Sequence, residues 1–96
     1  MNKAELIKKI VCEKYNLPGL CSVSRDRRYI FARAMFVKLL RDELKLQFAE
    51  ISALMERDWH YAGQVYKCHK KHFNNNTNGY RWDFQEVLEQ YKSGLC

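Results

Sequence analysis

Hydrophobic residues recur at helical spacing along most of the chain, and no segment alternates as a strand would. The first apolar stripe consists of Leu6, Ile7, Ile10 and Val11. It predicts a helix from Asn2, which caps the helix with Glu5 at the N3 position, to about Asn16. The Asn-Leu-Pro-Gly sequence of residues 16–19 is typical of a turn, and a loop is expected from there to about Ser24.

The longest helical signal runs from Ser24 to about Lys45. Its apolar positions, spaced by three and four residues, are Ile30, Ala34, Val37, Leu40 and Leu44. A helix with so much apolar surface belongs at the centre of the core. Arg25, Arg33 and Arg41 are eight residues apart, so we expect them to descend one polar, basic side of this helix.

A shorter helix is predicted from about Gln47 to Met55, followed by a tight turn at residues 56–57. The residues of this helix expected to face inward are Phe48, Ile51, Leu54 and Met55. Asp58 is expected to cap the next helix, because Asp is a strong N-cap. Two helices joined by so short a turn indicate a helix-turn-helix over about residues 47–71.

The helix after Asp58 has two distinct faces. The apolar face consists of Ala62, Val65, Tyr66, His69 and Phe73. The other face consists of His60, Gln64, Lys67 and Lys71. In a helix-turn-helix the second helix presents its first residues to base edges in the major groove. Gln bonds adenine, Lys neutralises phosphate and Asp accepts from cytosine N4, so this face fits DNA.

The polar residues 74–79 predict a loop, and a last amphipathic helix is expected after it, ending by Gly94. The apolar positions of that helix are Phe84, Val87, Leu88 and Tyr91. The sequence therefore predicts an all-α fold of five or six helices, as a single domain over residues 1–96.

Charge narrows the choice of partner. The 96 residues contain 17 Lys and Arg against 11 Asp and Glu, which gives a net charge of +6 and favours a polyanion or an acidic partner over a small-molecule substrate. No apolar run approaches the roughly 20 residues of a membrane span. The amino end is charged where a secretory signal would be apolar, so we expect a cytoplasmic protein.

Catalytic and metal-binding motifs are absent from the sequence. The four cysteines include no C-x-x-C pair, so reduced thiols are expected rather than zinc or disulfides. Only Cys68, His69 and His72 have a metal-like spacing, and a second ligand pair is missing; we expect Cys68 to pack and one His to lie at the surface. Without a P-loop, a G-x-S-x-G or an H-E-x-x-H, we expect no enzyme and no cofactor.

Several segments resemble the C-terminal DNA-binding domain of DnaA, the bacterial chromosomal replication initiator. The segments are Ala32-Arg33-Ala34-Met35 with Leu39-Leu40-Arg41, Leu46-Gln47-Phe48-Ala49-Glu50-Ile51-Ser52, and Arg57-Asp58-Trp59-His60-Tyr61. The second is similar to the family's Leu-Ser-Leu-x-Glu-Ile-Gly and the third to its Arg-Asp-His-Ser/Thr-Thr-Val. Upstream, residues 11–17 and 24–27 are similar to its first helix and basic loop, so the resemblance spans about residues 6–91.

The resemblance implies a role for each matched residue. Arg25 would reach into the minor groove, Arg33 and Arg41 would act on phosphates or a base, and residues 58–61 would read bases in the major groove. Together with the polar helix face, the predicted DNA-binding residues are Arg25, Arg27, Arg33, Arg41, Asp58, Trp59, His60, Tyr61, Gln64 and Lys67.

The chain departs from the family where the bases would be read. Trp59 replaces the usual His, His60 and Tyr61 replace two hydroxyl residues, and Glu56 alone replaces a Gly-Gly turn. Bulky aromatic residues cannot make the contacts of a small Thr, so the family's target sequence is not carried over. Trp59 itself is open to two interpretations, a core residue or a base contact.

The leading hypothesis is sequence-specific binding of double-stranded DNA in the regulation of replication or transcription. The resemblance covers no ATP-binding part, so the chain is expected to act as a detached DNA reader. The alternative is a protein-interaction module for an acidic partner such as a host replication initiator. An enzyme acting on nucleic acid is a third class, for which Asp58, His60 and His69 form no recognisable catalytic set.

Overall fold

The computed structural model describes residues 3–20, 27–75 and 79–94, which form five α-helices and no strand. The helices are α1 Lys3–Tyr15, α2 Arg27–Asp42, α3 Phe48–Leu54, α4 Tyr61–Asn74 and α5 Tyr80–Gly94. The all-α prediction is confirmed. The expected cap Asn2 and the expected first residues of the long helix, 24–26, lie outside the described residues. Among the helices described, none is long and apolar enough to cross a membrane.

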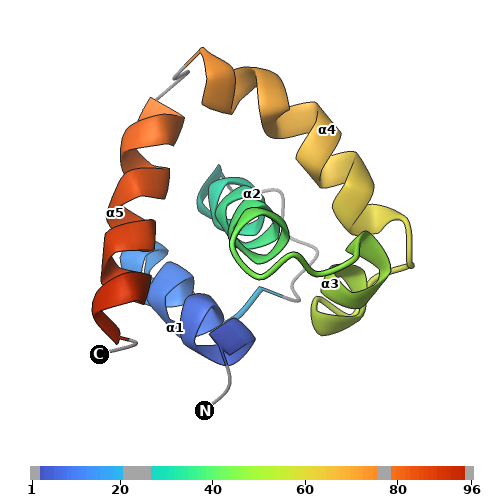
Figure 1. Ribbon diagram of the computed structural model, residues 1–96, viewed down its shortest axis with the longest axis horizontal. Helices are drawn as coiled ribbons and strands as arrows, with labels where there is room; N and C mark the ends of the chain where they lie inside the picture. The colour runs from blue at the N-terminus through green and yellow to red at the C-terminus, as the bar shows by residue number, and fades with distance from the viewer. Residues whose placement is uncertain (1–2, 21–26, 76–78, 95–96) are drawn as a thin grey trace.

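The central helix is α2, which contacts each of the other four helices (Figure 1). Residues 32–37 are all buried, together with Leu39 and Leu40, so α2 is enclosed on nearly every side. Three predictions for α2 are wrong. Arg33 is only 8% exposed instead of lying on a polar side, and Ile30 in the first turns is exposed. The helix also ends at Asp42, before the predicted end near Lys45.

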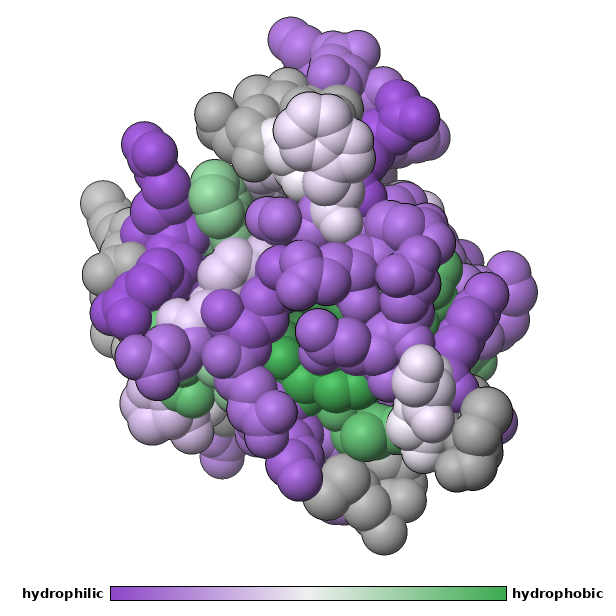
Figure 2. Space-filling view, turned by 90° about the vertical axis from the view of Figure 1, so that its left-hand side faces the viewer, coloured by the Kyte–Doolittle hydropathy of each residue, from purple (hydrophilic) through white to green (hydrophobic). Residues whose placement is uncertain are grey.

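Helices α1 and α5 pack against each other and against α2. Their buried residues are Ile7, Ile10 and Val11 of α1 and Tyr80, Val87 and Tyr91 of α5. At their contact, Lys14 Nζ lies 2.6 Å from Glu86 Oε2, and the Tyr15 hydroxyl donates to Asp83 at 3.2 Å. Burial, reinforced by the Asp83 carboxylate, raises the pKa of Tyr15. Figure 2 shows that the surface on this side is mostly hydrophilic, with a smaller hydrophobic area near its middle.

Within residues 3–20, 27–75 and 79–94, three turns place a non-glycine residue in the left-handed region of the backbone. Asn16 has φ of 55° and ends α1 where the sequence predicted. Lys45 follows α2 with φ of 57°, and Glu56 follows α3 with φ of 56°. This conformation costs an ordinary residue about 1–2 kcal/mol, so the surrounding packing has to hold each turn. The turn at Glu56 lies between α3 and α4, so it contributes to the direction in which α4 begins.

The exposure of Ile51 and Leu54, which both lie on α3, shows which face of this short helix points toward the core. Ile51 is fully buried, whereas Leu54 is 43% exposed, so the predicted inward position of Leu54 is wrong. Leu54 lies at the end of α3, where only a shallow hollow beside α1 receives it. The burial of an apolar residue on α3 thus depends on its distance from the end of the helix as well as on the helix face that it occupies.

We expect Ile51→Ala to lower the free energy of unfolding by about 2–5 kcal/mol, because it leaves a cavity in the core. Leu54→Ala is the matched control on the same helix, and its effect should be much smaller because the side chain is partly in water. Urea unfolding followed by circular dichroism measures both variants. Equal losses would contradict this assignment of the α3 faces.

Candidate functional site

A buried serine joins α3 to α4. Ser52 is fully buried, its hydroxyl donates to the Trp59 carbonyl at 3.2 Å, and it accepts from the Ala62 N–H at 2.8 Å. Ala62 lies in the first turn of α4, where backbone N–H groups have no partner within the helix. His60, the residue before α4, makes no side-chain cap. Ser52 therefore supplies, from the neighbouring helix, the cap that α4 lacks.

Backbone hydrogen bonds fix the turn between the two helices. The amides of Met55 and Arg57 both donate to the Ser52 carbonyl, at 3.1 and 3.0 Å, and the Tyr61 amide donates to the Asp58 carbonyl at 3.0 Å. Asp58 thus contributes its main chain, and the prediction that Asp58 caps α4 is wrong. The helix begins three residues later, at Tyr61, because the capping group comes from α3.

An open groove of about 570 Å³ lies between α3 and the first turns of α4. We call it the α3–α4 groove; it is lined by Gln47, Phe48, Ala49, Trp59, His60, Gly63, Gln64 and Lys67. Trp59 is 74% exposed, so it is not a core residue, and its ring meets that of His60 edge-on at 5.3 Å. No residue of α1 or α5 lines this groove.

The floor of the groove is the Phe48 ring, which is held from several sides. The Arg41 guanidinium lies 4.7 Å from the ring centre, and the Tyr66 ring lies 5.4 Å away. Arg41 also donates to the Leu46 carbonyl at 3.0 Å, which ties the segment before α3 to α2. A Cβ added at Gly63 would stand 3.5 Å from Phe48, in ordinary van der Waals contact, so α4 passes close to the ring and no side chain at this position covers it. The floor is therefore a fixed apolar surface.

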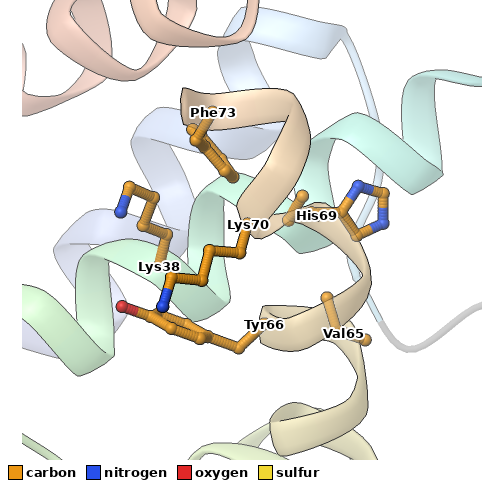
Figure 3. A pocket seen from close by; sticks show the side chains of 7 residues that line it. Lys38, Val65, Tyr66, His69, Lys70 and Phe73 are labelled. Carbon is orange, nitrogen blue, oxygen red and sulfur yellow. The ribbon is translucent and has the colours of Figure 1, made fainter. Parts of the chain in front are cut away.

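A network of charged and aromatic groups anchors α4 to α2. Lys38 Nζ lies 2.7 Å from Asp42, and the Tyr66 hydroxyl donates to the other Asp42 oxygen at 2.9 Å. The same ammonium group lies 5.0 Å from the Phe73 ring centre. In Figure 3 the Lys38 and Tyr66 side chains lie together, while the His69 ring points away from them. The cavity here is only about 10 Å³, too small for a ligand larger than one water molecule.

The structure separates the predicted DNA-binding residues into three groups. Arg25 lies outside the described residues. Arg33 is buried, and Arg41 and Tyr61 are half-buried, so these three face the interior at least in part. The exposed group consists of Arg27, Asp58, Trp59, His60, Gln64 and Lys67. Of the exposed group, all but Arg27 lie on the turn or on α4, and four of them line the groove.

Charge is distributed unevenly over the exposed surface. The sequence contains no Asp or Glu from Trp59 to Trp82, whereas α4 carries the exposed Lys67, Lys70 and Lys71. On the α1 and α5 side, acidic residues face basic ones, as in the pair of Lys14 with Glu86. The polar face of α4 therefore attracts anions more strongly than the α1 and α5 side does.

Sequence reasoning missed the apolar half of the groove. Phe48 was expected to face inward with the core, and Gln47, Ala49 and Gly63 were not assigned a role. One signal was available: a glycine inside an amphipathic helix indicates a close approach of another group, and Gly63 is such a residue. The partner of that approach, Phe48, is 15 residues away in the sequence and depends on the tertiary structure.

The residues with metal-like spacing do not form a metal site. No group of three His, Cys, Asp or Glu side chains among the described residues could hold a metal ion. Cys68 is exposed, so the expectation that it packs is wrong. His69 instead stacks on Tyr80 of α5, with 3.1 Å between its Nδ1 and the Tyr80 hydroxyl. Burial, with a smaller effect of nearby His72, lowers the pKa of His69.

Comparisons of the chain with protein-family models, with curated proteins and with solved structures find no match.

We expect Ser52→Ala to lower the free energy of unfolding by about 1–3 kcal/mol, because it leaves the Ala62 N–H and the Trp59 carbonyl without their partner. Ser93→Ala, at an exposed serine of α5, is the control and should change stability by less than about 0.5 kcal/mol. Both are measured by urea unfolding. A Ser52→Ala variant as stable as the control would show that α4 is capped by another group.

Acid is expected to destabilise the fold through His69. An unfolded histidine has a pKa of about 6.5 and folded His69 a lower one, so the folded state binds fewer protons. The contribution of neutral His69 to the free energy of unfolding is therefore fully present above pH 6.5, and it is lost as the pH falls toward the lower pKa of the folded state. His69→Gln should make stability flatter between pH 7.5 and 5.5, measured by urea unfolding. If His69→Gln kept the wild-type slope and the control His60→Gln removed it, His69 would not be the titrating group.

Proposed function

We propose that this chain binds double-stranded DNA, with the first half of α4 in the major groove. The observation that carries the proposal is the exposed face of α4, which is free of acidic residues, on a helix that is bonded to both α3 and α2. An α-helix with its side chains is about 10–12 Å wide, and the major groove is about 12 Å wide. The pair of α3 and α4 therefore has the dimensions of a DNA-binding helix-turn-helix, and the exposed face of α4 has the positive charge.

The exposed residues of α4 divide into two roles along the helix. His60 and Gln64 lie near its start, where they would meet base edges, since Gln bonds adenine through two hydrogen bonds. Lys67 and Lys71 lie further along and would neutralise phosphates. Arg27, exposed at the start of α2, would add a further phosphate contact. This assignment describes binding and includes no catalytic step and no cofactor.

The resemblance to the DnaA C-terminal domain supports the same proposal and differs from it at two arginines. It implies DNA contacts for Arg33 and Arg41, but Arg33 is buried and Arg41 bonds the Leu46 carbonyl. We assign both to the scaffold that positions the α3–α4 groove, while the predicted contact of Arg25 stays a prediction. A DNA reader of this kind would act in the cytoplasm, in the regulation of replication or transcription.

Salt dependence tests whether the partner is DNA. Duplexes are first selected from a random pool, and their affinity is then measured over a series of salt concentrations. Each phosphate neutralised adds about −0.9 to the slope of log K against log salt, so we expect a steep slope. Lys67→Gln should reduce that slope by about one on selected and random duplexes alike.

The matched control for this prediction is Lys9→Gln, which removes the same charge from an exposed position on α1. It should leave the slope unchanged, whereas a general effect of net charge would change both variants equally. A shallow slope, or no enrichment of any duplex, would contradict DNA binding and favour an acidic protein partner instead. Circular dichroism confirms that each variant is folded.

A further inference from the structure

The α3–α4 groove is mostly apolar along α3 and mostly polar along α4. Phe48 and Ala49 line it from α3 beside the polar Gln47, the exposed Trp59 lines it from the turn, and no side chain at Gly63 covers the Phe48 ring. No acidic side chain lines it. A partner that complements this groove therefore carries apolar groups next to negatively charged groups.

The major groove of DNA has this combination of chemistry. Its one apolar group at the base edges is the C5-methyl of thymine, and phosphates lie on both sides of it. Polar base edges would meet Gln64 and His60, phosphates would meet Lys67, and the methyl groups would meet Phe48, Ala49 and Trp59. At about 570 Å³ the groove is much larger than one methyl group. It has room for the methyl groups of successive thymines, which are about 3.4 Å apart along a strand.

We propose that the α3–α4 groove recognises thymine through its 5-methyl group, with Trp59 as the main contact. This inference rests on the proposed function and specifies the DNA that the site prefers: duplexes with consecutive thymines facing the start of α4. Trp59 is well placed for the task, since its carbonyl is bonded to the buried Ser52 while its side chain stays exposed. The backbone is fixed, and the indole is open to a ligand.

Replacing thymine by deoxyuridine tests the proposal, because the substitution removes the methyl group and leaves every hydrogen-bonding group of the base in place. Each thymine of the selected duplex is replaced in turn, and the dissociation constant is measured by fluorescence anisotropy. We expect the constant to rise about fourfold for each methyl group that the groove buries. Thymines outside the contact should show no change.

Two tryptophan variants identify the contact. In Trp59→Ala most of the difference between the thymine and deoxyuridine duplexes should disappear, because the main contact of the methyl group is gone while Phe48 and Ala49 remain. Trp82→Ala removes an equally exposed tryptophan from α5, outside the groove, and should keep the full difference between the two duplexes. Both side chains are in water, so neither variant is expected to unfold.

The outcomes separate this inference from the proposed function. Steep, salt-dependent binding with equal affinity for thymine and deoxyuridine at every position would overturn the methyl contact and leave DNA binding in place. A full, undiminished difference in Trp59→Ala would also overturn it, because Trp59 would then not be the main contact of the methyl group. Absence of binding to any duplex would instead refute the proposed function itself.

Discussion

The hydroxyl of Ser52 is the interaction on which the arrangement of α3 and α4 depends. It caps the start of α4, where the side chain of His60 makes no cap, and it also holds the carbonyl of the exposed Trp59. Both bonds are in a fully buried place, where water cannot replace a lost partner. The Ser52 hydroxyl therefore ties the start of α4 to α3, with Glu56 supplying the left-handed turn between the two helices.

Contacts with α2 hold α3 and α4 in this arrangement. The central helix α2 holds the segment before α3 through the bond of Arg41 to the Leu46 carbonyl, and it holds α4 through the bond of the Tyr66 hydroxyl to Asp42, which Lys38 also contacts. These charged groups are partly buried but are satisfied by one another and by aromatic rings, which reduces the cost of removing them from water. The half-buried Lys38 and Arg41 thus belong to the contacts between helices, whereas the lysines of α4 are exposed.

The spacing of apolar residues predicted the helices well, because it indicates which residues become buried when an amphipathic helix packs. It placed α1, α3 and α5 to within a residue or two at the ends that are described. It was wrong about Arg33, since a helix enclosed by four others buries residues that no single apolar stripe contains. It was wrong about Asp58, since the true cap of α4 is on another helix. The polar half of the groove was expected from the face of α4, whereas Phe48 and Gly63 depend on a contact between helices.

The close approach of α1 and α5 has a practical consequence. A Cβ added at Gly94, at the end of α5, would stand 3.2 Å from Leu6, so the end of the last helix lies against the beginning of the first. Neither helix lines the α3–α4 groove. A fluorophore or a second copy attached through either helix end would leave the groove accessible. In two copies linked in tandem, binding of one groove to a partner would raise the effective concentration of the second groove at that partner. The gain in avidity would depend on the length of the linker.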